Sequence, residues 1–291
     1  MHGNDLKSAL VELIRRSSTD LGKEWEVAIR EAAKNEEPDS GARVALDTIL
    51  ANISTARESS APMCQDTAFL NFFVDYPSGG AESIYTEAIK EAVIEATKKQ
   101  YLRPNSVDVL TGKNSGDNTG VNAPIITFHQ WNNDYVRIRF LQKGGGCENC
   151  SAQYKIPDTS IEAGRDLNGA RKMVIDAVVK AQGQGCAPGI LGIAIGGDRA
   201  SGMKLAKEQL FRKPGERSED KRLSELEQRL LKDLNELGIG PMGFGGKTTA
   251  LEVFVATQNR HPATYYISVA YSCWAYRNCT ITIKGDEVTY A

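Results

Sequence analysis

Apolar residues recur at helical spacing through the first part of the chain. The residues that set this period are Leu6, Leu10, Leu13, Ile14, Trp25, Val27, Ala28 and Ala32. A repeat of three to four residues puts apolar side chains on one face of a helix, so residues 5–34 predict two amphipathic helices with a break near 17–20. Turn-forming residues at 36–41 precede a third helix over 42–57. We expect residues 1–57 to form a helical layer that serves packing.

The rest of the chain mixes the helical repeat with the two-residue alternation that is typical of strands. Further helices are predicted over 81–99, 170–182, 201–210 and 222–237, and strands over 69–75, 125–130, 135–141, 190–195, 250–257, 265–271, 280–284 and 287–290. The turn residues 132–134 between two strands indicate a hairpin. Residues 103–124 and the charged segment 212–221 are expected to be loops.

No internal repeat, low-complexity tract or clear linker divides the 291 residues. We therefore expect one α+β domain over residues 1–291, in which a mixed sheet carries the helical layer at its N-terminal side.

Composition excludes several classes of protein. Hydrophobic residues make up 41% and charged residues 25% of the chain, as in ordinary globular proteins. The 35 Lys and Arg residues nearly balance the 37 Asp and Glu residues, so the charge favours neither nucleic acid nor an anionic membrane as partner. The first residues lack the layout of a signal peptide, and no run of apolar residues is long enough to span a membrane. These features predict a cytoplasmic protein.

Cys147 and Cys150 form a C-x-x-C after three glycines. This spacing occurs in redox pairs and in half of many zinc sites. A zinc ribbon needs a second such pair or two nearby histidines, and the sequence has neither. A zinc- or redox-regulated binding protein that uses these two cysteines is nevertheless one alternative for the function.

Three other cysteines lie among turn-forming residues. Cys64 follows Pro62, Cys186 lies in a segment rich in glycine and proline, and Cys273 comes directly after a predicted strand. Tight turns can aim distant thiolates at one point, which favours a metal site. Buried cysteines without any such role are also common, so the spacing alone does not decide between the two.

The segment Cys64-Gln65-Asp66-Thr67 resembles the C-Q-D-T motif of the iron–sulfur hydro-lyases, the family of class I fumarase and the L-tartrate dehydratase α subunit. The other segments that match this family, in order, are Leu102-Arg103-Pro104-Asn105, Asn114-Ser115-Gly116-Asp117-Asn118, Lys143-Gly144-Gly145-Gly146, Gly185-Cys186-Ala187-Pro188, Leu237-Gly238-Ile239-Gly240-Pro241, Arg260-His261-Pro262 and Cys273-Trp274-Ala275. The likeness extends from about residue 40 to 280 and departs at Ala68, where the family usually has glycine.

The resemblance implies that Cys64, Cys186 and Cys273 hold a [4Fe–4S] cluster. Three thiolates on four irons leave one iron without a cysteine ligand, and that iron can act as a Lewis acid. On the same grounds, Cys147, Cys150 and Cys279 are not ligands.

The resemblance also implies the residues that meet the substrate. Asp66 corresponds to the acid–base group beside the substrate hydroxyl, although an aspartate in a polar loop more often caps a turn. Gln65, Arg103, Gly145 and His261 correspond to substrate-binding positions. An arginine suits a dicarboxylate because its guanidinium offers two parallel donors. Asn105, Asn114 and Asn118 are interpreted as turn formers.

As a whole, the resemblance implies the α subunit of a hydro-lyase that converts fumarate reversibly to (S)-malate. An L(+)-tartrate dehydratase α subunit is the alternative within the family, and a cluster-free structural subunit is a further one. The group that removes the carbon-bound proton is expected on a separate β subunit, in an α2β2 heterotetramer.

Gly245-Gly246-Lys247-Thr248 resembles the end of a phosphate-binding loop. The first glycine of that motif would fall on Pro241, and a strand rather than a helix is predicted to follow. ATP binding is therefore not expected.

Overall fold

The computed structural model describes residues 3–291, and its contacts divide the chain into two compact units. The first unit comprises the segment that ends at Leu21, Ala51–Gly145 and Arg277–Ala291, and the second comprises Gly22–Leu50 and Gly146–Tyr276. Each unit is thus built from separate segments of the chain. The single catalytic domain expected over residues 1–291 stays a prediction.

The first unit is a five-stranded sheet with helices packed on it. Its elements are α1 (Gly3–Thr19), the second half of α3 (Gly41–Ser59), β1 (Phe69–Pro77), α4 (Glu82–Lys98), β2 (Ile125–Trp131), β3 (Val136–Lys143), β8 (Arg277–Lys284) and β9 (Glu287–Tyr290). The strand order is β2-β1-β3-β8-β9. Only β1 and β2 run parallel, so the sheet is mixed as predicted.

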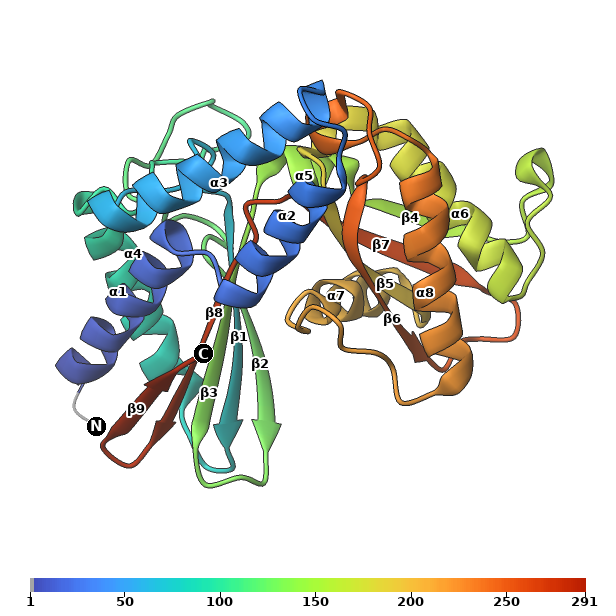
Figure 1. Ribbon diagram of the computed structural model, residues 1–291. Helices are drawn as coiled ribbons and strands as arrows, with labels where there is room; N and C mark the ends of the chain where they lie inside the picture. Colours follow the sequence, from blue (N-terminus) through green and yellow to red (C-terminus); the bar gives the residue numbers. More distant parts are fainter. Residues whose placement is uncertain (1–2) are drawn as a thin grey trace. The chain divides into compact units, whose positions relative to one another are not determined.

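Alternate residues of the strands make the core of the first unit. Leu70, Phe72 and Val74 of β1 lie on the face that packs against α1 and α4 (Figure 1). Phe72 stacks on Phe140 of β3 with ring centroids 4.4 Å apart. Because side chains alternate across a strand, the polar residues Asn71 and Asp75 point to the opposite face.

The predicted hairpin between β2 and β3 is wrong. Both strands exist, but β1 lies between them and pairs with each. Seven consecutive residues of β1, from Leu70 to Tyr76, are buried. A strand of this kind belongs in the interior of a sheet, where both of its edges are hydrogen-bonded.

The second unit holds a four-stranded sheet in the order β4-β7-β5-β6. Its elements are α2 (Lys23–Asn35), the first half of α3, most of α5 (Gly145–Cys150), β4 (Ala152–Lys155), α6 (Leu167–Ala181), β5 (Gly189–Gly196), α7 (Arg199–Gln209), α8 (Lys221–Glu236), β6 (Ala250–Gln258) and β7 (Tyr266–Ser272), with short 3-10 helices at Thr159–Ile161, Gln182–Gly185 and Pro241–Gly243. Strands β5 and β6 run parallel, and β7 runs antiparallel to both of its neighbours.

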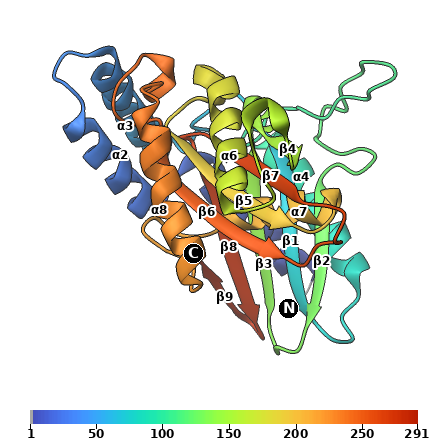
Figure 2. The ribbon, with the colours of Figure 1, turned by 90° about the vertical axis from the view of Figure 1, so that its right-hand side faces the viewer.

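Helices cover both faces of this second sheet. Figure 2 shows α6 and α8 side by side over the strands, where they bury Leu191 and Ile193 of β5. On the other face α7 approaches β5 closely, because Gly192 has no Cβ and such an atom would lie 2.0 Å from the carbonyl oxygen of Ala206. Every residue of β5 is buried, as the short apolar run predicts.

The α+β class and the long elements are confirmed. The helix α5 and the strand β4 were not predicted, because the glycines and polar residues of 144–155 match neither period. The three helices of the predicted N-terminal layer exist, but α1 belongs to the first unit and α2 to the second. Within residues 3–291, no helix combines the length and apolarity that a membrane span requires.

Candidate active site

Four of the predicted site residues line one pocket in the first unit. Its volume is about 530 Å³, and Gln65, Asp66, Arg103 and Gly145 are part of its wall. The remaining lining residues are Ala68, Phe69, Pro104, Asn105, Val107 and Asn114. These residues come from the loop before β1 and the start of that strand, the long loop after α4, and the start of α5. The pocket is large enough for a small dicarboxylate.

Backbone groups hold the Asp66 carboxylate in place. Its Oδ1 accepts a hydrogen bond from Ala68 N–H (2.9 Å), and its Oδ2 accepts one from Gly145 N–H (2.7 Å). The Arg277 guanidinium donates to the carbonyl oxygen of Asp66. The side chain therefore does more than cap a turn, since it joins two loops that are 79 residues apart in sequence.

Two backbone features allow this arrangement. A Cβ on Gly144 would lie 2.9 Å from Oδ2 of Asp66, so only glycine leaves room for the carboxylate there. Ala68 has φ +81°, in the left-handed region that favours glycine. The departure from the family motif at Ala68 thus falls on a position that the backbone strains.

Arg103 is held through its main chain and presents its side chain to solvent. Its N–H donates to Thr67 Oγ1 (2.9 Å), and its carbonyl oxygen accepts from Asn118 Nδ2 (2.8 Å). Across residues 3–291, no hydrogen bond or ion pair of the guanidinium is found, and the residue is exposed. The charge is therefore available to an incoming carboxylate.

Asn118 organises this loop. It is buried, adopts φ +64°, and its Oδ1 accepts from Asn105 N–H at 2.7 Å. Asn114 supports the neighbouring turn by accepting from Gly116 N–H and donating to the carbonyl oxygen of Pro104. The interpretation of these asparagines as turn formers agrees with these bonds.

Sequence reasoning missed two residues that hold the pocket. Arg277 is 1% exposed and reaches Asp66 from the start of β8. Thr67 is also buried, and its Oγ1 both accepts from Arg103 N–H and donates to the carbonyl oxygen of Arg103. The signal that could have identified Arg277 is its place at the start of a strand face that is otherwise apolar.

The cysteines that resemble cluster ligands are divided between the units. Cys64 is half-buried in the first unit, directly before Gln65 and Asp66. Cys186 and Cys273 belong to the second unit, where Trp274 N–H donates to the carbonyl oxygen of Cys186 (3.3 Å). Two of the three turns are thus joined by their backbones. Cys186 has φ +54°, which agrees with the tight turn that the sequence predicts.

No set of three His, Cys, Asp or Glu side chains within residues 3–291 is gathered into a metal site. The structure defines each unit by itself, and the three-cysteine centre stays a prediction. The donor set does suit iron and sulfide, since thiolates are the usual ligands of such clusters.

The other three cysteines differ in surroundings. Cys279 lies in the apolar core of the first unit, and burial raises the pKa of its thiol to about 11, so it is a poor ligand at neutral pH. Cys147 is 5% exposed, and its Sγ makes a long contact (4.0 Å) with the carbonyl oxygen of Gly185, next to Cys186. Cys150 follows at the end of α5.

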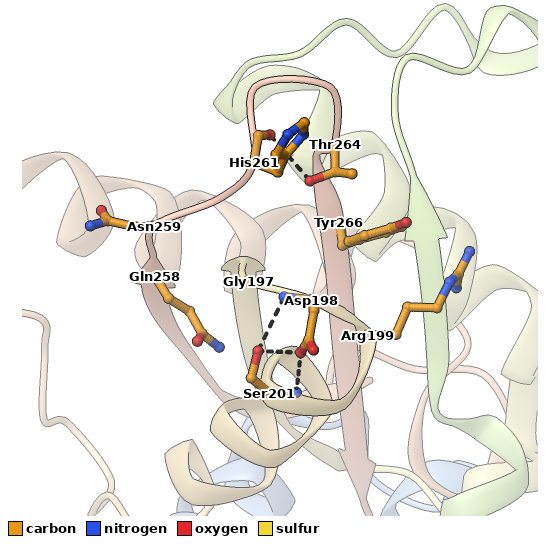
Figure 3. Close-up of a pocket in the computed structure, with 9 residues that line it drawn as sticks. All are labelled: Gly197, Asp198, Arg199, Ser201, Gln258, Asn259, His261, Thr264 and Tyr266. Atoms are coloured by element: carbon orange, nitrogen blue, oxygen red, sulfur yellow. Dashed lines mark hydrogen bonds between the residues drawn. The ribbon is translucent and has the colours of Figure 1, made fainter.

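His261 lines a different pocket, of about 500 Å³, in the second unit. Figure 3 shows it on the loop above Gln258, Asp198 and Arg199. Its Nδ1 accepts a hydrogen bond from Ala263 N–H (3.1 Å), which leaves Nε2 as the ring atom that can bind a ligand. His261 belongs to the second unit and the pocket of Asp66 to the first, and the substrate-binding role of His261 stays a prediction.

The loop that resembles a phosphate-binding motif encloses a carboxylate of the same unit. The Glu36 side chain accepts from the N–H groups of Lys247 (2.9 Å) and Thr248 (2.9 Å), and the residue is 4% exposed. Successive backbone N–H groups of this kind bind anions. Here the anion that these N–H groups bind is the Glu36 carboxylate of the same unit.

A family model described as "Fumarate hydratase (Fumerase)" matches residues 7–282. This chain belongs to the fumarate hydratase family. The matched range includes every candidate site residue from Cys64 to Cys273.

Three relatives illustrate the range of fumarate hydratase family members that this chain resembles. It is 46% identical to "Putative fumarate hydratase class I" of Geobacillus stearothermophilus, over 97% of this chain and 55% of that protein. It is 37% identical to "Putative L(+)-tartrate dehydratase subunit alpha" of Methanocaldococcus jannaschii, over 97% and 98%. With the L(+)-tartrate dehydratase subunit alpha of Escherichia coli K12 the identity is 31%, over 87% and 82%. The chain therefore spans about half the length of the first relative.

Proposed function

We propose that this chain is the α-type part of a hydro-lyase that adds water reversibly to a small unsaturated dicarboxylate, with fumarate giving (S)-malate. The observation that carries this proposal is the pocket in which a fixed carboxylate, Asp66, lies with the exposed guanidinium of Arg103. Family membership supports it, since relatives with either substrate name cover nearly the whole chain.

The residues of the pocket have separate roles in substrate binding and proton transfer. Arg103 binds one substrate carboxylate through two parallel N–H donors, and the Gln65 amide hydrogen-bonds the substrate beside it. Asp66 takes one proton from the water molecule that adds as hydroxide, and in the reverse direction gives a proton to the substrate hydroxyl, which leaves as water. The two N–H groups on Asp66 fix its oxygens, so the carboxylate is oriented before substrate arrives. His261 contributes Nε2 as a further donor to the substrate.

Cys64, Cys186 and Cys273 would hold a [4Fe–4S] cluster. When bound, its iron without a cysteine ligand would supply a Lewis acid for the substrate hydroxyl and carboxylate. The backbone bond between the segments of Cys186 and Cys273 supports this ligand set, as does the position of Cys64 next to the pocket residue Gln65.

A second chain completes the enzyme in this proposal. The relatives named subunit alpha match at similar length, whereas the fumarate hydratase relative is almost twice as long. We infer that a β chain brings the base for the carbon-bound proton, within a cytoplasmic α2β2 assembly.

Tartrate is the alternative substrate. Two relatives with this name match 97% and 87% of this chain, and the proposed chemistry is the same because tartrate is also a hydroxy-dicarboxylate. A zinc- or redox-regulated binding protein that uses Cys147 and Cys150 is the alternative from another class, and the family match favours the hydro-lyase over it.

The test is anaerobic co-expression of the chain with a β chain from the same source, after loading with iron and sulfide. Hydration of fumarate should be measured together with dehydration of L(+)-tartrate, for the pair and for each chain alone. We expect a brown pair that acts on one of these acids and chains that are inactive alone. A fully loaded pair without activity on any small dicarboxylate would refute the proposed reaction.

A further inference from the structure

Tyr271 lies at the end of β7, two residues before Cys273, and is 1% exposed. Its ring fills the space left by two glycines on either side of Cys186. A Cβ on Gly185 would lie 2.3 Å from Cε1 of the ring, and one on Gly189 would lie 2.6 Å from its hydroxyl oxygen. The ring is therefore in close contact with the turn that carries Cys186.

Cysteines lie around this ring. Cys273 follows it by two residues, Cys186 comes directly after the Gly185 that the ring touches, and Cys147 Sγ contacts the carbonyl oxygen of the same Gly185. The Cys147 contact with the carbonyl oxygen of Gly185 and the Trp274 bond to Cys186 hold these segments together. Cys186 and Cys273 are the cluster ligands that we assign to this unit.

The hydroxyl group of Tyr271 has no hydrogen-bond partner among the described residues, although it is fully buried. Leaving a buried hydroxyl unsatisfied is costly, and buried tyrosines nearly always find a partner. The backbone of the same residue is satisfied, because its N–H donates to Ser151 Oγ (3.1 Å). The exception is therefore confined to a hydroxyl that lies against Gly189, three residues after Cys186.

We propose that the Tyr271 hydroxyl donates a hydrogen bond to a sulfur atom of the iron–sulfur cluster, and so raises the reduction potential of the bound cluster. This inference rests on the proposed function, because it requires the cluster. Hydrogen bonds to cluster sulfurs stabilise the more negative, reduced state and are among the known determinants of its potential. Tyr271 is in this sense a positioning and tuning residue that does not touch the substrate.

The test compares the wild type with Tyr271→Phe, which keeps the ring and removes only the hydroxyl. Tyr154→Phe is the control, since Tyr154 is a half-buried tyrosine of the second unit whose hydroxyl bonds to Asp176. All three proteins are loaded anaerobically as α–β pairs, and iron, sulfide and the midpoint potential of the cluster are measured. We expect equal loading, a lower potential for Tyr271→Phe, and an unchanged potential for Tyr154→Phe.

Equal loading with the same potential and the same electron paramagnetic resonance spectrum in Tyr271→Phe and wild type would overturn the inference while leaving the proposed function intact. Failure of the wild type itself to take up iron and sulfide would overturn both. A shift of the same size in Tyr154→Phe would also count against Tyr271, since it would reflect general repacking.

Stability of the cluster-free chain supplies a second, independent measurement. If the hydroxyl has no hydrogen-bond partner until the cluster binds, its removal leaves the cluster-free chain at least as stable as the wild type. The reason is that the variant no longer buries an unsatisfied polar group. A lower urea midpoint for cluster-free Tyr271→Phe would mean that the protein or a buried water already satisfies the hydroxyl, and the inference would fail. This measurement decides the matter even if the variant loads poorly.

Discussion

The Asp66 carboxylate accepts a hydrogen bond from the backbone N–H of Gly145 at 2.7 Å. Gly145 follows the end of β3 and Asp66 precedes the start of β1, and these two strands are antiparallel neighbours. The bond therefore connects the segments that flank the paired strands at the wall of the pocket. The bond needs an acceptor oxygen on Asp66.

Asp66→Asn should keep the fold and abolish turnover. The amide has one acceptor where the carboxylate has two, so one N–H loses its partner, and the amide cannot take up the proton of the hydroxyl group. We expect kcat to fall by roughly 100-fold or more, the usual size of a lost acid–base group. Steady-state kinetics of the loaded α–β pair, with circular dichroism as the folding control, measure this. Unchanged kcat would remove Asp66 from the mechanism.

Gly144→Ala should displace the same carboxylate without touching its charge. The new Cβ would lie 2.9 Å from Oδ2, so the side chain must shift. We expect kcat to fall by roughly tenfold to 100-fold, because even a small displacement of a reacting group raises the activation barrier. Gly146→Ala is the matched control, since its Cβ would meet only the carbonyl oxygen of Gln184 at 3.5 Å, an ordinary contact. Equal losses in both variants would contradict the steric explanation.

Ala68→Gly should stabilise the protein. The φ of +81° costs a non-glycine residue roughly 1–3 kcal/mol, and glycine gives back about 0.5–1 kcal/mol of chain entropy. We expect a net gain of about 1 kcal/mol in the free energy of urea unfolding. Ala61→Gly, in the same loop but without a positive φ, should be neutral or destabilising. A loss of stability in Ala68→Gly would show that the backbone there is not strained.

Local physics made much of this architecture predictable. The periodic runs of α4 and α8 and the alternating run of β3 each contain enough residues for their period to be unambiguous. The pocket was partly predictable for another reason: Gln65, Asp66, Arg103 and Gly145 lie in motifs that a family resemblance identifies, and the structure brings those four together.

The features that were missed depend on contacts that no local pattern encodes. The pairing of β1 with both β2 and β3 is set by burial of β1, not by the turn at 132–134. The segment 212–221 is a loop as expected, yet Arg212 donates to the fully buried Glu227 at 2.6 Å. A charged run in sequence does not reveal that one of its members has a buried partner.

Replacing the three proposed ligands separates them from the other thiols. Cys64→Ser, Cys186→Ser and Cys273→Ser should each prevent stable loading, because a serine hydroxyl is not ionised at neutral pH. Cys147→Ser and Cys150→Ser should load like the wild type. The measurement is bound iron and sulfide per chain after anaerobic loading. Full loading of a Cys186→Ser chain, or loss of the cluster in Cys150→Ser, would refute the ligand assignment.

Glu36→Gln tests whether the loop that resembles a phosphate-binding motif is a structural anion site. Glu36 is 4% exposed and accepts from the N–H groups of Lys247 and Thr248, more than 200 residues away in sequence. A glutamine turns its NH₂ group toward one of these donors and removes the charge that strengthens both bonds. We expect a loss of about 2–3 kcal/mol in the free energy of urea unfolding.

The neighbouring substitution Glu37→Gln is its control. Glu37 also meets Lys247, through Nζ at 2.6 Å, but that ion pair lies on the surface. Water screens such pairs, so the variant should unfold like the wild type. The fluorescence of Trp25, which packs on Phe254 and Tyr276 in the same unit, reports the transition. If Glu36→Gln and Glu37→Gln were equally stable, the buried carboxylate would not be what holds this loop, and an external anion would become the better explanation for its N–H groups.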